Sequence, residues 1–177
     1  MDTIPVHALW LAQDDPKKNT AVLASKRGDL TLHKNVRSLP KRGVILEPLC
    51  GKVLGPEDHE LLTQRGGALV GLDCSWAHIE TSVESVMKRT RLQPRMLPLL
   101  LAANPVNWGK PGRLTTAEAL ATVLYLVGRR DQAADVLGAF RWGGRFFELN
   151  REPLDAYASA TSSQQLVDLQ FDFFDIE

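Results

Sequence analysis

The segment at residues 68–73 constrains the fold of this chain more than any other. It reads Ala-Leu-Val-Gly-Leu-Asp, without alternation of apolar and polar side chains and with a carboxylate only at its end. Strands that are buried on both faces have this pattern, and they belong to parallel sheets covered by helices. Strand-like segments at 6–12 and 43–48 and a short helix at 55–62 come before it. The first half therefore alternates strand and helix and predicts an α/β fold with a parallel sheet.

After Ser75 the pattern becomes helical. Thr115 and Glu118 have the spacing of a capping box, which marks a helix start. Residues 21–25 fit a strand or the start of a helix equally well, and we expect the last ~15 residues to be only loosely held. No further strand is expected, and the predicted helices of this half cover residues 81–89, 96–103, 115–127, 131–140 and 146–157.

Length and composition exclude several classes of protein. The 177 residues suit one domain, or two small domains that share an interface, and 44% hydrophobic with 24% charged residues excludes a fibrous or largely disordered chain. The sequence has no long apolar span and no signal-peptide pattern. Cys50 and Cys74 are too few for a zinc site and have no histidine at finger spacing. We therefore expect a cytoplasmic protein without a metal site or membrane contact.

The charges balance, with 21 basic and 21 acidic residues. A neutral chain is not expected to wrap nucleic acid over its whole surface, but it can still carry a basic face. Basic residues gather at 17–18, 26–27, 34–42 and 88–95. Each cluster could meet a phosphate backbone or could be an ordinary solvated loop or helix end.

Two segments have the residue types of a ligand site. Residues 97–118 run from an apolar stretch through Asn104, Asn107 and several glycines and prolines into the capped helix, and they form either a ligand loop or an ordinary connector. Asp73 ends the most apolar strand, which places it at the edge where parallel sheets bind ligands. There it could accept a proton, orient a cationic ligand or cap the next helix.

Cys74 and two tryptophans complete the candidates. No histidine stands at a recognisable spacing from Cys74, so we interpret it as a small packed residue rather than a nucleophile. Trp76 and Trp108 lie in loop sequence. An indole there can stack on a base or on adenine, lie against a cationic centre, or simply pack.

Several motifs together resemble those of a known family. Each motif alone would be weak, but their joint occurrence in one order, from about residue 8 to residue 157, is specific to the small-subunit (16S/18S) ribosomal RNA aminocarboxypropyltransferases. The motifs read Asp15-Pro16-Lys17-Lys18-x-Thr20, Asp73-Cys74-Ser75-Trp76, Ala102-Ala103-Asn104-Pro105-Val106-Asn107, Gly109-Lys110-Pro111, Phe140-Arg141-Trp142-Gly143 and Phe146-Phe147-Glu148-Leu149-Asn150.

The resemblance implies an enzyme that transfers the 3-amino-3-carboxypropyl group of S-adenosylmethionine to N3 of a (N1-methyl)pseudouridine in small-subunit ribosomal RNA and releases methylthioadenosine. Family members are similar to SPOUT-type knotted RNA methyltransferases, so a trefoil knot, otherwise nearly absent from proteins, is implied as well. Residues 1–94 would form the parallel-sheet part, and the helical residues 95–177 would complete the knotted donor site. The implied partner is ribosomal RNA or a pre-ribosomal subunit, and we expect a monomer.

The donor's sulfonium has three carbons open to attack, so orientation in the site decides which group is transferred. Trp76 is our candidate for the wall that holds the methyl group away from the RNA. Asp73 could act as a general base toward N3 or bind the amino group of the donor, and the sequence does not separate these roles. By motif position, the resemblance implies donor contacts from Thr20, Leu46, Pro48, Leu72, Asp73, Trp76, Leu97, Gly112 and Thr116.

We assign RNA binding to the basic residues nearest to these motifs in sequence, which are Lys17, Lys18, Lys26, Arg27, Lys34 and Arg37.

The chain departs from the family pattern at two positions. Trp108 stands where a tyrosine is usual, and Gly112 stands where an aromatic residue is common, so Gly112 could contact the donor only through its backbone. Two other functions are compatible with the sequence. One is an RNA methyltransferase of SPOUT type that uses the same donor, and the other is a ribosome-assembly factor that binds RNA without catalysis.

Overall fold

Strand β4 (Ala68–Asp73) lies at the centre of a five-stranded sheet in the computed structural model, which describes residues 3–176. The strand order is β2-β1-β4-β3-β5 and every pair of neighbours is parallel. The predicted α/β fold with a parallel sheet is therefore confirmed. The other strands are β1 (Val6–Trp10), β2 (Thr31–His33), β3 (Gly43–Leu46) and β5 (Gln93–Arg95).

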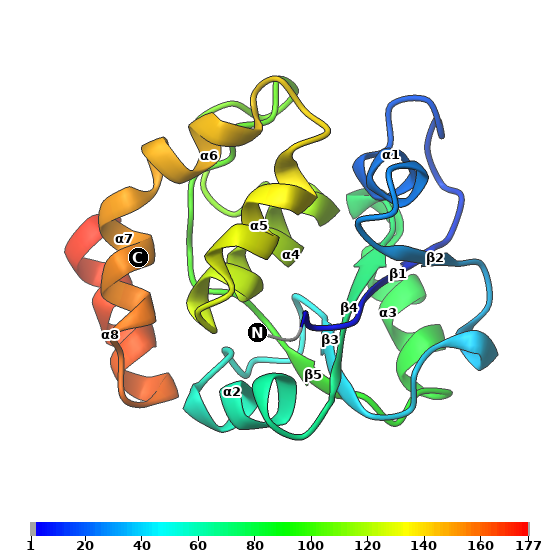
Figure 1. Ribbon diagram of the computed structural model, residues 1–177, viewed down its shortest axis with the longest axis horizontal. Coiled ribbons are helices and arrows are strands. Elements are labelled where there is room, and N and C mark those ends of the chain that lie inside the picture. Colours follow the sequence, from blue (N-terminus) through cyan, green and yellow to red (C-terminus); the bar gives the residue numbers. More distant parts are fainter. Residues whose placement is uncertain (1–2, 177) are drawn as a thin grey trace.

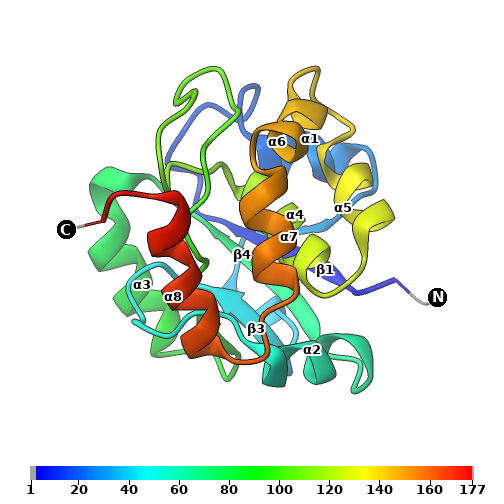
Figure 2. The same cartoon turned by 90° about the vertical axis from the view of Figure 1, so that its left-hand side faces the viewer.

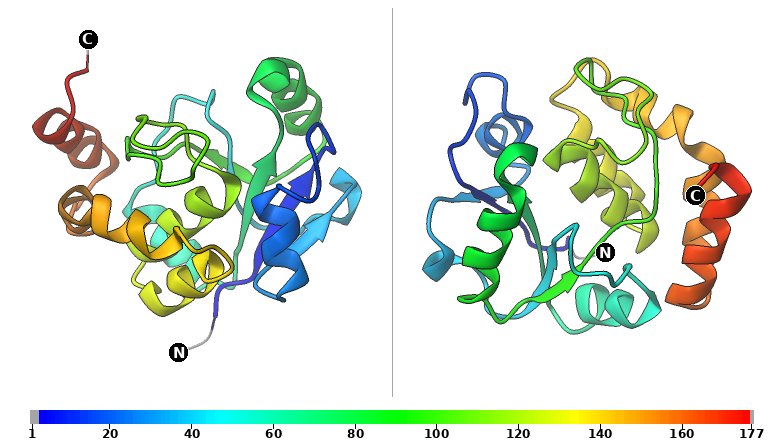
Figure 3. Two further views of the ribbon diagram at one scale, coloured as in Figure 1. Left: turned by 90° about the horizontal axis from the view of Figure 1, so that it is seen from above. Right: turned by 180° about the vertical axis from the view of Figure 1, so that it is seen from behind.

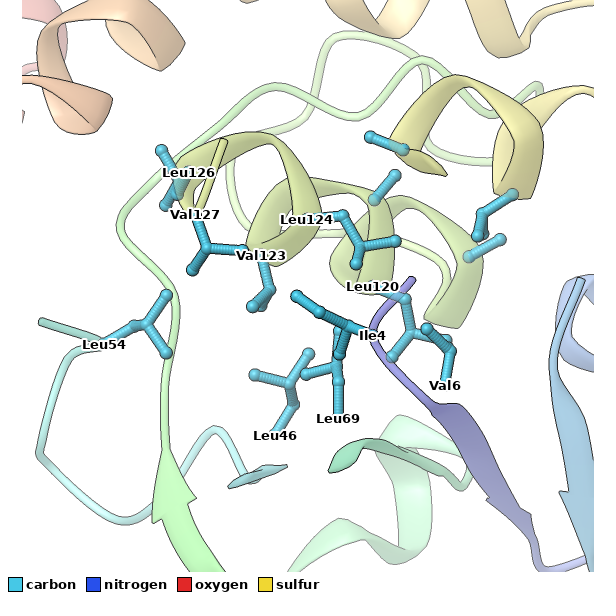
Figure 4. Close-up of a cluster of buried hydrophobic side chains, with 14 of the residues drawn as sticks. Ile4, Val6, Leu46, Leu54, Leu69, Leu120, Val123, Leu124, Leu126 and Val127 are labelled. Carbon is cyan, nitrogen blue, oxygen red and sulfur yellow. The ribbon is translucent and has the colours of Figure 1, made fainter. Parts of the chain in front are cut away.

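Both faces of β4 are buried, as its apolar pattern predicts. Leu69 joins the larger core cluster on one face, whereas the next residue, Val70, packs on the other face with Val86 of α3 (Ile79–Met87). Figure 4 shows Leu69 and Leu46 of the sheet against Leu120 and neighbouring side chains of α4 (Thr116–Leu126). The larger cluster also takes side chains from α1 (Thr20–Lys26), from α2 (Pro56–Thr63) and from the helices after α4.

The helices that follow α4 form a further layer around it, and the last two of them lie at the left of Figure 1 and in front in Figure 2. The predicted helix at 146–157 is two helices that meet at Asn150, and the expectation of a loosely held end is wrong because a further helix follows. That last helix buries Leu166, and its Gln170 bonds to Leu99. The helices of this layer are α5 (Arg130–Leu137), α6 (Gly143–Leu149), α7 (Arg151–Ala158) and α8 (Ser163–Phe173).

The segment at 96–103 is extended, so the helix predicted there is wrong, and so is the expected absence of strands after Ser75. Pro94 and Pro98 disfavour helical backbone at the residues before them. Side chains from the C-terminal helices also satisfy the backbone of this segment. Tyr157 Oη donates to the Leu99 carbonyl (2.9 Å), and the Asn150 amide bonds to both the N–H and the carbonyl of Leu101 (2.8 and 2.9 Å). Tertiary hydrogen bonds therefore override the apolar run.

No helix in the described part of the chain is both long and apolar enough to span a bilayer.

Gly43 begins β3 at a position that only glycine can occupy. Its φ is +142°, and an added Cβ would overlap the backbone of Ala68 on β4. We expect Gly43→Ala to lower the free energy of unfolding by about 3 kcal/mol, because the β3–β4 pairing must shift. Gly28 is the matched control, since its φ is +85° but an added Cβ would meet nothing within 4 Å. Gly28→Ala should cost only about 1 kcal/mol in the same urea titration. Equal losses in the two variants would contradict this account.

Candidate functional site

A cavity of about 230 Å³ opens where the carboxyl ends of β3, β4 and β5 meet. In an open parallel sheet this edge is where ligands bind. The first turn of α4 closes the cavity from the helical side, beginning with the capping box of Thr115 and Glu118 that the sequence predicts. The lining residues are Leu46, Glu47, Pro48, Gly71, Leu72, Cys74, Trp76, Ile79, Arg95, Met96, Leu97, Pro98, Leu99, Gly112, Leu114, Thr115, Thr116 and Ala119.

The structure brings the sequence-predicted donor residues together at this cavity. Asp73 and Thr20 do not line it but adjoin it. The Asp73 carboxylate accepts a hydrogen bond from the Thr116 hydroxyl (3.1 Å), and the Thr20 hydroxyl accepts one from the Ala117 N–H (3.2 Å). The seven predicted residues in the lining are Leu46, Pro48, Leu72, Trp76, Leu97, Gly112 and Thr116.

Gly112 has a structural reason for lacking a side chain. Its φ is +72°, its N–H donates to the Leu100 carbonyl (2.9 Å), and an added Cβ would touch Leu99. A ligand could therefore meet only backbone at this point, as its residue type predicts.

Asp73 is the acidic centre of a small network at the mouth of the cavity. Its second oxygen accepts from the Asn19 amide, which also donates to both carboxylate oxygens of Asp14 (3.0 and 2.9 Å). Burial raises the pKa of the Asp73 carboxyl and the charge of Asp14 adds to the rise, whereas the hydrogen bonds from Asn19 and Thr116 oppose it. A carboxylate poised in this way can accept a proton or hold a cationic group.

The surroundings of Cys74 disfavour a nucleophile, in line with its interpretation as a packed residue. Burial and the neighbouring Asp73 raise the pKa of its thiol to about 11, so the reactive thiolate is scarce. Trp76 is 46% exposed although it lines the cavity, and the Arg113 guanidinium lies 5.3 Å from its ring centre. An exposed indole at a cavity mouth can form a wall for a ligand that the protein itself does not cover.

Sequence reasoning misses three supporting groups. Asn19 caps α1 through its side chain (Asn19 Oδ1 to Val22 N–H, 3.0 Å) while its amide reaches Asp73, and the capping position before Thr20 is the signal that could have found it. A buried ion pair between Arg95 and Asp58 (3.0 Å) lies beside the cavity and ties β5 to α2. Residues 37 positions apart give no local signal for such a pair.

Glu118 is the third supporting group and is fully buried. Its two oxygens accept from the N–H groups of Ala103 (2.7 Å) and Thr115 (2.9 Å) and from the Asn104 amide (2.7 Å). The capping box predicts only the Thr115 contact. The other two hold the 97–112 segment against α4, so Glu118 fixes the wall of the cavity.

The six basic residues predicted to bind RNA are all exposed, but the structure does not place them together. Lys17 and Lys18 lie on the loop that carries Asp14 and Asn19, close to the cavity mouth. Lys34 lines a second, more open groove of about 600 Å³ beside α3. Arg37 follows Lys34 three positions later in the chain. Lys26 and Arg27 end α1, which returns the chain from the end of β1 to the start of β2, so both lie toward the opposite edge of the sheet.

Within residues 3–176 no three His, Cys, Asp or Glu side chains are grouped so that they could hold a metal ion.

The fold and this edge-of-sheet site define a class of protein. Residues 44–174 match the family described as "Ribosome biogenesis protein, C-terminal". The structure is also similar to that of the SAM-dependent rRNA:acp-transferase Tsr3 from Vulcanisaeta distributa, with a TM-score of 0.83 and 33% sequence identity over 96% of this chain and 98% of the other.

Relatives with a named activity narrow the class of protein further. The chain is 41% identical to the 16S rRNA aminocarboxypropyltransferase of Methanothermobacter thermautotrophicus and 43% identical to that of Methanopyrus kandleri, in each case over 90% of this chain and 92% of the relative. The protein of the same name from Methanocaldococcus jannaschii is 37% identical over 98% of both chains. The chain therefore belongs to the 16S rRNA aminocarboxypropyltransferase family.

Proposed function

We propose that this protein transfers the 3-amino-3-carboxypropyl group of S-adenosylmethionine to N3 of a pseudouridine in small-subunit ribosomal RNA. The observation that carries the proposal is the cavity at the end of β4, which gathers the donor residues expected from the family motifs beside one poised carboxylate. Family membership and the printed activities of the relatives support the reaction class and the donor.

The proposed step balances without a metal or a redox partner. N3 attacks the aminocarboxypropyl carbon bonded to sulfur, the carbon–sulfur bond breaks with its electron pair going to sulfur, and neutral methylthioadenosine leaves. The N3 proton passes to a base, for which Asp73 is the candidate, or to water. Leu46, Leu72, Leu97 and Trp76 supply apolar walls that can hold the nucleoside and the methyl group, so alignment selects the carbon that reacts.

The test is mass analysis of 16S rRNA from a strain that lacks the modification, after incubation with the protein and S-adenosylmethionine. We expect one nucleoside to gain an aminocarboxypropyl group, and methylthioadenosine to accumulate in equal amount. Formation of S-adenosylhomocysteine with a methylated nucleoside would instead identify a methyltransferase, and an unmodified RNA that still binds the protein would identify an assembly factor.

We also propose that the chain forms the trefoil knot that the family resemblance implies. After edge strand β5 the chain returns to the middle of the sheet, where Thr116 lies close to Gly71. We also propose that the protein is a monomer and acts in the cytoplasm, on ribosomal RNA or on the pre-ribosomal subunit.

A pH dependence follows from the network around Asp73. Since the carboxyl pKa is raised, the fraction of ionised Asp73 falls as the pH drops through that raised value, and the transfer rate should fall with it. Asp14→Asn removes a neighbouring negative charge, which lowers the pKa of Asp73. The acid limb of the kcat profile should therefore move to lower pH in this variant, whereas a limb at an unchanged pH would contradict the role of the Asp14 charge.

A further inference from the structure

The loop next to the cavity, residues 101–112, forms a hairpin that is held by backbone hydrogen bonds. An antiparallel bridge pairs Leu101 with Pro111, the Gly109 N–H donates to the Ala102 carbonyl (2.7 Å), and the Ala102 N–H donates to the Lys110 carbonyl (3.1 Å). These backbone contacts do not depend on which side chains stand at the tip of the hairpin.

Asn104 holds the hairpin from inside. Its side-chain oxygen accepts from the Asn107 N–H (3.0 Å), while its amide donates to Glu118 (2.7 Å) and to the Arg113 carbonyl (3.2 Å). The tip is thus fixed to α4 before any partner arrives, so binding there would not have to order a flexible loop.

Two large apolar side chains of the hairpin nevertheless face solvent. Val106 is 84% exposed and Trp108 is 52% exposed. Within the described residues no ring contact or hydrogen bond to the Trp108 side chain is found, and Trp108 does not line the cavity. Val106 and Trp108 lie two positions apart on one backbone-paired hairpin, so together they offer an apolar contact surface for another molecule.

The charge of the hairpin favours a nucleic acid as that molecule. Residues 101–113 contain Lys110 and Arg113 and no acidic residue. Arg113 also lies over Trp76 at the cavity mouth, which links the hairpin to the reaction site. The hairpin rises at the same end of the molecule as the 11–19 loop, which carries Lys17 and Lys18, as Figures 1 and 3 show from different sides.

We propose that this hairpin binds the RNA substrate. Trp108 stacks on an unpaired base near the target nucleotide, and Lys110 contacts an adjacent phosphate. Base stacking on an aromatic side chain suits this position because it needs an exposed ring face and no side-chain pocket. This inference rests on the proposed function for the identity of the RNA.

The test compares Trp108→Ala and Trp108→Phe in binding to fluorescently labelled 16S rRNA transcript at fixed salt. We expect Trp108→Ala to weaken RNA binding roughly tenfold, whereas Trp108→Phe stays within about threefold of the parent because the ring remains. The Kd for S-adenosylmethionine should not change in either variant. Phe171→Ala is the matched control, since Phe171 is 60% exposed on α8 and should leave RNA binding unchanged.

Lys110→Ala adds an independent readout. Loss of one phosphate contact should reduce the slope of log K against log salt concentration by about one, at equal affinity for the donor. RNA binding by Trp108→Ala as tight as that of the parent would overturn the proposal. If that variant instead lost binding only to the assembled subunit, the hairpin would be a protein-docking site. Failure of the transfer reaction leaves these binding measurements intact, so the two proposals can fail separately.

Discussion

Replacing Asp73 with alanine should reduce transfer by about 10²–10⁴-fold while the protein stays folded. Asp73 is the carboxylate at the cavity mouth, and its oxygens are already oriented by Thr116 and Asn19. Because burial raises its pKa, the ionised form is less favourable in the folded protein than in the unfolded chain. Removing the carboxylate therefore should not lower the free energy of unfolding at neutral pH.

Steady-state kinetics with both substrates separate the two roles open to Asp73. A general base would be lost mainly in kcat, together with the acid limb of the pH profile, and Asp73→Asn would be as impaired as Asp73→Ala. A group that binds the donor's ammonium would be lost mainly in the Kd for S-adenosylmethionine. Asp135→Ala, an exposed acid on α5, is the control. Transfer near the parent rate in Asp73→Ala would remove this residue from the mechanism.

Replacing Glu118 with alanine should lower the free energy of unfolding by about 3–5 kcal/mol, the largest stability effect that we expect from one side chain. The change leaves the N–H groups of Ala103 and Thr115 and the Asn104 amide without their buried acceptor, and each unsatisfied group costs about 1–3 kcal/mol. Donor binding should weaken as well, because the 97–112 wall of the cavity loses its attachment to α4.

Glu118→Gln is the graded control. Its carbonyl oxygen can keep the Thr115 and Asn104 contacts, but its amide would then face the Ala103 N–H, so one hydrogen bond is lost instead of three. Urea denaturation should therefore rank the proteins parent, Glu118→Gln, Glu118→Ala in order of decreasing stability. An alanine variant as stable as the parent would contradict this prediction, because it would mean that water accepts the hydrogen bonds in place of the carboxylate.

The sheet could be predicted from sequence wherever its strands are buried. Residues 68–73 have the apolar run expected of a strand that is covered on both faces, and the structure places them at the centre of the sheet. Strands β2 and β5 have three residues each and lie at the edges, where so short a segment carries no pattern. The 96–103 segment has a helical composition, but hydrogen bonds from Tyr157 and Asn150 keep it extended. Contacts between residues so far apart in sequence give no signal in the local sequence pattern.

The candidate site, like the sheet, could be predicted from sequence only in part. Asp73 ends the apolar strand and stands in a family motif, and Thr116 follows the capping residue Thr115 at the start of α4, so both positions could be predicted. Asn19 and Asp14 act on Asp73 across more than 50 positions of sequence, and only the parallel pairing of β1 with β4 brings them together. Proximity in sequence to the motifs predicts the six basic RNA-binding residues, but it does not gather them in space, because α1 carries Lys26 from the end of β1 toward the start of β2.

The most direct test of the central claim uses S-adenosylmethionine labelled in the methyl carbon in one reaction and in the carboxyl carbon in another, each with unmodified 16S rRNA. We predict that carboxyl label enters the RNA and that methyl label stays in methylthioadenosine, because in the proposed orientation of the donor the aminocarboxypropyl carbon faces the RNA. Methyl label in the RNA without carboxyl label would contradict this account and assign the cavity to a methyltransferase.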